Sequence, residues 1–171
     1  MFKQIYPTLF ACIITLGIVI LMACNGAVGV SAGIKKDLNT GLSSSYKNME
    51  PQKVYLSMNG EELGHTDIPI GETFFVINDN VKGMVKKDGK VAVGCALKIT
   101  DKTGKILLNE ADLFKDHDIF HPDSAKQLRC AVTTGNPMEW EEKYNVDVKF
   151  WDKNGDGSIE NKVTIRAIDM P

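Results

Sequence analysis

The stretch EKYNVDVKFWDKNGDGSIENKVTIRAI, residues 142–168, decides the fold of this chain. Apolar residues recur at every second position from Tyr144 to Phe150 and again from Val163 to Ala167. A period of two places one set of side chains on the buried face of a β-strand and the other set in solvent. The Asp, Asn and Gly residues between the two runs favour a tight turn. The stretch therefore predicts two half-buried strands joined as a hairpin.

The same alternation recurs earlier in the chain. It is clearest in Val54–Met58 and Val91–Ile99, and shorter β-rich segments lie at Thr73–Asn78 and Lys105–Asn109. Residue pairs that tolerate positive φ separate the segments, at Asn59-Gly60, Asp88-Gly89, Thr103-Gly104 and Asn154-Gly155. About seven short strands with this spacing predict a mainly β fold, an antiparallel β-sandwich.

One short helix is expected beside the strands. It would open at His121-Pro122-Asp123-Ser124 and run to about Val132, because proline suits a first helical position. Ala125, Leu128 and Val132 would share one face of this helix and cover one end of the sandwich. Gly135-Asn136-Pro137 would stop it.

The N-terminus carries a different signal. Lys3 precedes an apolar run from Thr8 that ends in Leu21-Met22-Ala23-Cys24. This ending resembles the lipobox of bacterial lipoproteins. The resemblance implies that residues 1–23 are a signal peptide, that a peptidase cuts before Cys24, and that Cys24 receives the lipid. It therefore implies an exported protein of the cell envelope, attached to a membrane through Cys24.

Two other interpretations of the N-terminus compete with the lipobox. Val30-Ser31-Ala32 offers a conventional cut site between small residues. An uncleaved transmembrane helix is the second alternative, but the run from Thr8 to Cys24 is only 17 residues long. That length is at the short edge of the roughly 20 residues needed to cross a bilayer. We therefore prefer the lipobox.

The composition divides the rest of the chain in two. Residues 24–52 are rich in Gly, Ala, Ser, Asn and Thr without periodicity, which predicts a lipidated cysteine followed by a flexible tether. As a coil, the tether would hold the domain about 30 Å from the membrane. Residues 53–171 form the predicted sandwich domain. The net charge of −2 does not suggest a nucleic-acid partner.

The turn of the hairpin resembles the first nine positions of the calcium loop of EF-hand and dockerin proteins. The resemblance implies five oxygen ligands, from Asp152, Asn154, Asp156, the Ser158 carbonyl and Glu160. The twelfth position is Val163 instead of the bidentate glutamate, and strands flank the loop instead of helices. A bound Ca²⁺ of low affinity is therefore one hypothesis.

A plain polar turn is the alternative to a calcium site, because Asp, Asn and Gly are the residues that exposed turns prefer. The segment Lys98–Gly104 supports it. It repeats the order of Lys149–Gly155, a strand followed by Asp-Lys-x-Gly. Two hairpin turns that solve the same backbone geometry would produce this echo.

Four cysteines reduce to two in a mature lipoprotein. Cys12 leaves with the signal peptide and Cys24 carries the lipid, so Cys95 and Cys130 remain and could pair in an oxidising compartment. The helix predicted around Cys130 argues against the pair. At 100° per residue, Cys130 lies roughly 170° from the apolar face of that helix.

No catalytic motif marks the chain as an enzyme. It has no Gly-x-Ser-x-Gly, His-Glu-x-x-His, phosphate-binding loop or dinucleotide fingerprint. We expect a non-catalytic binding or accessory module for an envelope protein or glycan. A structural or assembly component is the alternative, and a secreted hydrolase-like enzyme is a weaker one. The exposure of Trp140 and Trp151 discriminates between the binding module and the structural component. An exposed indole favours the binding role, and two buried indoles favour the structural role.

Overall fold

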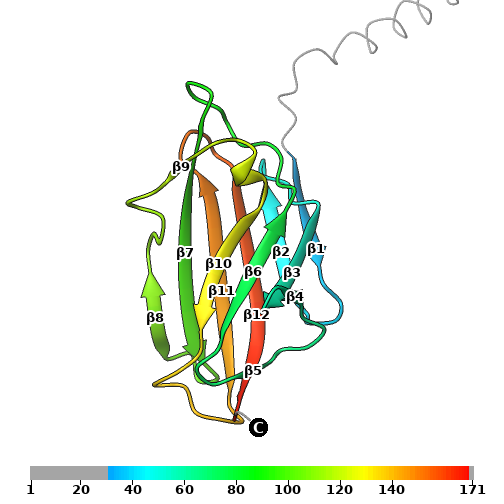
Figure 1. The fold of residues 1–171 in the computed structure, drawn as a ribbon, viewed down its shortest axis with the longest axis vertical. Helices are drawn as coiled ribbons and strands as arrows, with labels where there is room; N and C mark the ends of the chain where they lie inside the picture. The colour runs from blue at the N-terminus through cyan, green and yellow to red at the C-terminus, as the bar shows by residue number, and fades with distance from the viewer. Residues whose placement is uncertain (1–30, 170–171) are drawn as a thin grey trace, which may run out of the picture.

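The computed structural model describes residues 31–169, which form two β-sheets packed face to face (Figure 1). The larger sheet has the strand order β1 (Ala32–Lys36), β2 (Ser43–Lys47), β12 (Ser158–Ile168), β11 (Lys143–Asp152), β7 (Val91–Asp101), β8 (Ile106–Glu110). Two short strands extend it: β5 (Asp67–Pro69) runs parallel to β12, and β9 (Ile119–Phe120) pairs with β7. The smaller sheet has the order β10 (Leu128–Thr133), β6 (Thr73–Asp79), β3 (Lys53–Met58), β4 (Glu61–Glu62). The predicted mainly β sandwich is confirmed.

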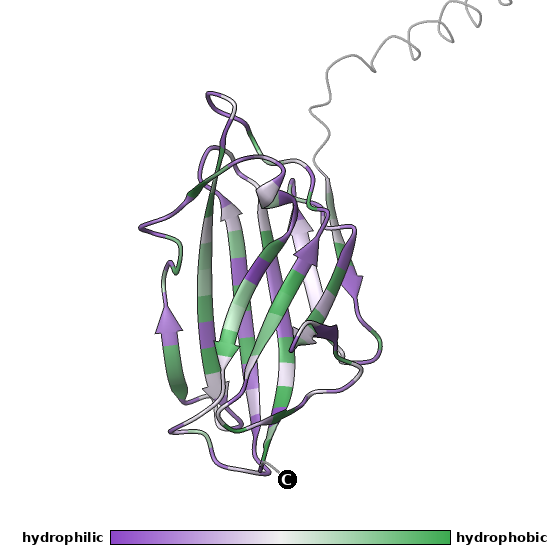
Figure 2. Cartoon of the chain, viewed as in Figure 1, coloured by the Kyte–Doolittle hydropathy of each residue, from purple (hydrophilic) through white to green (hydrophobic). Residues whose placement is uncertain are grey.

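The core lies between the sheets, where the predicted alternation places it. Along β11, Tyr144, Val146, Val148 and Phe150 are buried. The alternate residues Asn145, Asp147 and Lys149 point outward. Figure 2 shows the same alternation of polar and apolar residues along neighbouring strands. The hairpin of β11 and β12 forms as expected, with the Cα atoms of Trp151 and Ser158 opposite each other.

The helix prediction is wrong beyond its first turn. A 3₁₀ turn covers Ser124–Lys126, and the chain then becomes strand β10 from Leu128 onward. Leu128, Cys130 and Val132 are buried and alternate with exposed residues, and β10 pairs with β6. The segment fits two periods. The spacing of Leu128 and Val132 fits a helix, but the alternation of Leu128, Cys130 and Val132 fits a strand. Pairing with the edge of β6 favours the strand.

The predicted tether is also wrong over much of its length. Residues 32–47 contain β1 and β2, and β2 lies against β12, at the far end of the sequence. Ser44 and Asn161 are buried and hydrogen-bonded to each other across this pair. Met49 belongs to the hydrophobic core. The lipobox, the signal peptide and residues 24–30 of the tether lie outside the described residues.

The sandwich has two ends, upper and lower in Figure 1. At the upper end, β1 begins, β2 ends and the β11–β12 hairpin turns, because Lys47 pairs with both Ala32 and Ser158. The β7–β8 turn and the loop between β10 and β11 lie at the lower end (Figure 1). Within residues 31–169, no helix has the length and apolar character needed to span a membrane.

Candidate functional site

The upper hairpin holds the residues of the predicted calcium loop, and Asp152 is the most deeply placed of them. Its side chain is 3% exposed. Its Oδ1 accepts the Asn154 N–H at 2.8 Å and its Oδ2 accepts the Val85 N–H at 2.6 Å. Both carboxylate oxygens thus already bind backbone amides, one from the turn itself and one from the β6–β7 loop.

Asn154 lies beside Asp152, and its side-chain amide donates to the Val85 carbonyl at 3.3 Å, whereas Asp156 and Glu160 point to other partners. Asp156 accepts a hydrogen bond from Asn48 at 2.9 Å and pairs with Lys47 at 3.2 Å, and these two contacts lower the pKa of Asp156. Glu160 pairs with Lys149 at 3.0 Å on the outer face of the larger sheet. Over residues 31–169, no group of three or more His, Cys, Asp or Glu side chains could hold a metal ion. Calcium binding by this loop therefore stays a prediction.

Close packing accounts for two glycines of the loop. A Cβ on Gly155 would lie 2.7 Å from Val85 Cγ2, and a Cβ on Gly157 would lie 2.6 Å from Met49 Cγ. The glycines therefore let two neighbouring loops reach the hairpin, the β6–β7 loop through Val85 and the β2–β3 turn through Met49.

Lys153 attaches a third loop to the same hairpin. Its Nζ lies 2.7 Å from Asp112 and 2.8 Å from Asp118, and all three side chains are largely covered. The Asp112 carboxylate also accepts the N–H groups of Cys95 and Phe114. Burial raises the pKa of Asp112, but the Lys153 ion pair and the two N–H groups outweigh it and hold that pKa below its usual value. The hairpin thus joins the loops of the upper end.

The two tryptophans differ in environment. Trp151 is half-buried and lies flat on Gly94 of the neighbouring strand, since a Cβ on Gly94 would be 2.1 Å from Trp151 Cζ2. Trp140, in the loop between β10 and β11 at the lower end, is 65% exposed. Trp140 is therefore the more exposed of the two indoles.

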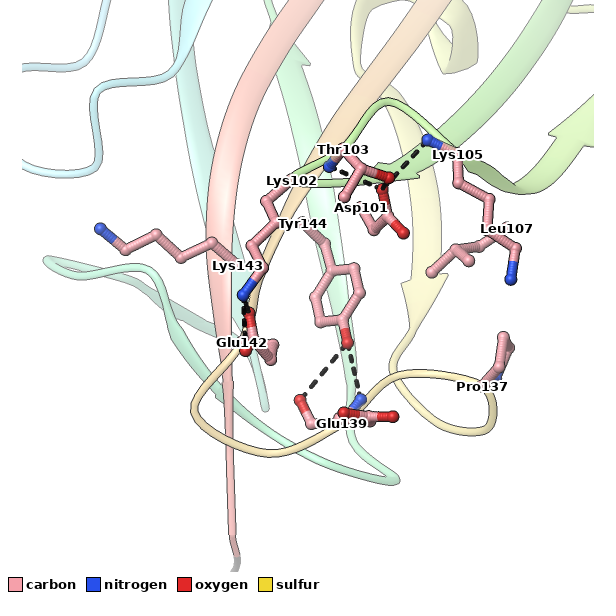
Figure 3. A pocket seen from close by; sticks show the side chains of 10 residues that line it. All are labelled: Asp101, Lys102, Thr103, Lys105, Leu107, Pro137, Glu139, Glu142, Lys143 and Tyr144. Atoms are coloured by element: carbon pink, nitrogen blue, oxygen red, sulfur yellow. Dashed lines mark hydrogen bonds and ion pairs between the residues drawn. The ribbon is translucent and has the colours of Figure 1, made fainter.

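A pocket of about 330 Å³ opens at the lower end, between the β7–β8 turn and the β10–β11 loop (Figure 3). Its walls are Asp101, Lys102, Thr103, Lys105, Leu107, Pro137, Glu139, Glu142, Lys143 and Tyr144. The Tyr144 ring points into the gap, and its hydroxyl accepts the Glu139 N–H at 2.6 Å (Figure 3). The ring thus forms the floor of the pocket, and its hydroxyl holds Glu139 at the rim.

The pocket carries charges of both signs. Lys102 and Glu142 form an ion pair at 2.8 Å, and the hydrogen bond that Lys102 donates to Glu142 raises the pKa of Lys102. Asp101 Oδ1 accepts the N–H groups of Thr103 and Lys105 and the Thr103 hydroxyl. These contacts, with the Thr103 hydroxyl as the strongest, lower the pKa of Asp101. Such walls suit a polar ligand that offers both donors and acceptors.

The loop that carries Trp140 is held on both sides of the indole. On one side Tyr144 holds Glu139. On the other, Glu141 donates its N–H to the Ala167 carbonyl at 2.7 Å, and its carboxylate pairs with Arg166 at 3.1 Å. Arg166 is fixed in turn by Asp67, whose pKa the guanidinium lowers.

The sequence analysis singled out Trp140 but missed the pocket beside it. The pocket joins residues about 40 positions apart in the chain, and the pairing of Tyr144 with Asp101 brings them together. No local motif marks such a site. A search with protein-family models finds no match for this chain, and a search of curated proteins finds none either.

Proposed function

We propose that this protein is an exported lipoprotein of the cell envelope, anchored through lipid on Cys24, and that its domain is a non-catalytic binding or accessory module. The upper end of the sandwich would face the membrane. The lower end, with Trp140 and the neighbouring pocket, would engage an envelope protein or a glycan.

The observation that carries the binding role is Trp140. A large indole in water is unfavourable for an isolated domain, and exposed tryptophans are typical of the centres of binding sites. The contacts of Glu139 and Glu141 hold its backbone before any partner arrives. Binding would therefore cost little conformational entropy in this loop.

The position of Ser31 supports the anchoring. Ser31 lies at the upper end, because its carbonyl accepts the Asn48 N–H and Asn48 adjoins the end of β2. Only residues 24–30 separate Cys24 from Ser31. Seven residues span at most about 25 Å when fully extended. The lipid would thus hold the upper end against the membrane and leave the lower end free.

The charge of the upper end is compatible with this orientation. The β6–β7 loop carries exposed lysines at 82, 86, 87 and 90, with Asp88 as its single acidic residue. None of the four lysines forms an ion pair within the part of the chain that the structure describes. Each lysine near an anionic membrane surface contributes about 1 kcal/mol of attraction.

The anchoring is tested with the full chain and its Cys24→Ser variant. We expect the wild-type chain to incorporate labelled fatty acid and to partition into detergent, and the variant to do neither. An equal distribution of the two proteins in the aqueous phase would remove the lipid anchor from the proposal.

The binding role is tested by photo-crosslinking in intact cells, with a photoreactive amino acid at position 140. The control carries it at position 119, because Ile119 is 63% exposed, like Trp140, but belongs to β9 near the upper end. We expect a discrete crosslinked product from position 140 that Tyr144→Phe weakens by loosening the loop. Equal products from both positions, or none from position 140, would contradict a binding site at the lower end.

A further inference from the structure

The two remaining cysteines lie on opposite sheets and point into the same core. Cys95 is on β7 of the larger sheet, opposite Phe150 in register, and Cys130 is on β10 of the smaller sheet, opposite Val76. They are 0% and 1% exposed. The helix phasing that argued against their pairing was wrong, because Cys130 belongs to the inward set of a strand.

The two thiols are neighbours in this core. Both belong to the same buried hydrophobic cluster between the sheets, and both are free cysteines in the structure. The neighbouring Cys130 thiol and burial raise the pKa of the Cys95 thiol far above its usual value. A thiol must lose its proton to attack a disulfide, so Cys95 is unreactive once the sandwich has closed.

Neither cysteine has a competing partner in the mature lipoprotein, because Cys12 would leave with the signal peptide and Cys24 would carry lipid. This step rests on the proposed function. Export would also place the chain in a compartment where disulfides persist.

We propose that Cys95 and Cys130 form a disulfide that links the two sheets of the exported protein. One thiolate attacks the disulfide of an oxidising thiol–disulfide exchange protein and releases one thiolate of that protein. The second cysteine attacks the mixed disulfide and releases the other. One S–S bond forms in this chain, and the two electrons and two protons pass to the oxidant as a dithiol. The exchange takes place before the sheets close.

The test uses the full chain produced in cells that export it. The protein is denatured in a thiol-alkylating reagent, with and without prior reduction, and analysed by mass spectrometry. We expect no alkylation at either position before reduction, alkylation of both after it, and a linked pair of peptides 2 Da lighter than the sum of the reduced ones. Cys95→Ser and Cys130→Ser serve as controls, because each leaves one alkylatable thiol.

The lipid on Cys24 is measured in the same sample, which separates the two proposals. Alkylation of both thiols without reduction, on a chain that carries the lipid, overturns the disulfide alone. A linked pair without lipid keeps the disulfide and overturns the anchor, and the absence of both overturns both.

Thermal unfolding provides a second measurement. The bond would close a loop between residues 95 and 130, so reduction should lower Tm by roughly 10 °C. The Cys95→Ala/Cys130→Ala double variant should melt near the reduced protein and show no response to reductant. A wild-type Tm that reductant does not change would contradict the bond.

Discussion

The β7–β8 turn at the lower end and the β11–β12 turn at the upper end begin with the same order of residues and end in different roles. In both, the aspartate Oδ1 accepts the N–H two positions later, at 2.8 Å for Asp101 and at 2.8 Å for Asp152. The partners of Asp101 all belong to its own turn. Asp152 uses its second oxygen to hold Val85, which lies 67 positions away in the chain.

The difference shows what a short polar motif can decide. Asp-Lys-x-Gly fixes the local turn, because aspartate bonds the backbone two residues ahead. The loops that surround the turn decide whether its aspartate is buried and which residues outside the turn it binds. Loops pack over Asp152 and bury it, whereas Asp101 stays on the rim of a pocket.

The largest effect is expected from removal of the buried carboxylate. Asp152→Ala leaves the N–H groups of Val85 and Asn154 without their acceptor in a covered site, which should lower the free energy of unfolding by about 2–3 kcal/mol. Chemical denaturation measures it. Asp152→Asn is the matched control and should recover part of the loss, since its amide oxygen can still accept one N–H. A variant as stable as the wild type would show that the hairpin does not hold the upper loops.

A smaller loss is expected at the second contact of the upper hairpin. Gly94→Ala places a Cβ 2.1 Å from the Trp151 ring and must displace the indole, at about 1–3 kcal/mol. The tryptophan at the other end provides the comparison, because Trp140→Ala should change stability by no more than about 0.5 kcal/mol. Comparable losses for the two variants would mean that Trp140 also packs on the domain.

At the lower turn, Asp101→Ala should shift Tm by less than half of the Asp152→Ala shift. Its folded-state pKa lies below the ordinary 3.8. Its contribution to stability is therefore complete above pH 3.8 and is lost as the pH falls through the folded-state pKa. The Tm difference between wild type and Asp101→Ala, measured from pH 7 downward, should narrow in that acidic window. A Tm difference that does not change with pH would show that the stabilisation by Asp101 does not depend on its negative charge.

The smallest effect is expected from calcium. In the described arrangement the Asp152 oxygens bind amides and Asp156 binds Lys47 and Asn48, so millimolar Ca²⁺ should leave Tm unchanged relative to a chelator. A rise that Asp152→Ala and Asp156→Ala together abolish would instead establish the calcium site and show that the loop rearranges on binding.

The strands with strong alternation could be predicted from the sequence, and those without it could not. β11 and β12 alternate over many residues, so their buried face follows from the period alone. β2 has no such run, since Ser43, Ser44 and Ser45 carry no apolar period. It becomes a strand because the edge of β12 offers hydrogen bonds to it. β10 contained both periods, and its neighbour β6 decided between them.

The candidate site was predicted in part for a similar reason. Trp140 stands out by residue type, and Cys95 and Cys130 by elimination. The contacts of Tyr144 with Glu139 and of Arg166 with Glu141 join residues from different elements, and only the fold shows that they hold the indole in place.

The position of β2 in the sheet also affects the order in which the strands can fold. Its neighbour in the sheet is β12, and the Ser44–Asn161 bond joins residues 117 positions apart. An exported chain that emerges with its N-terminus first would deliver β1 and β2 long before β12, the strand that completes their sheet. Pairing of this kind is slow even after synthesis, because distant segments must meet before any contact repays the lost entropy. The earliest strands of the sandwich are thus among the last to be fixed.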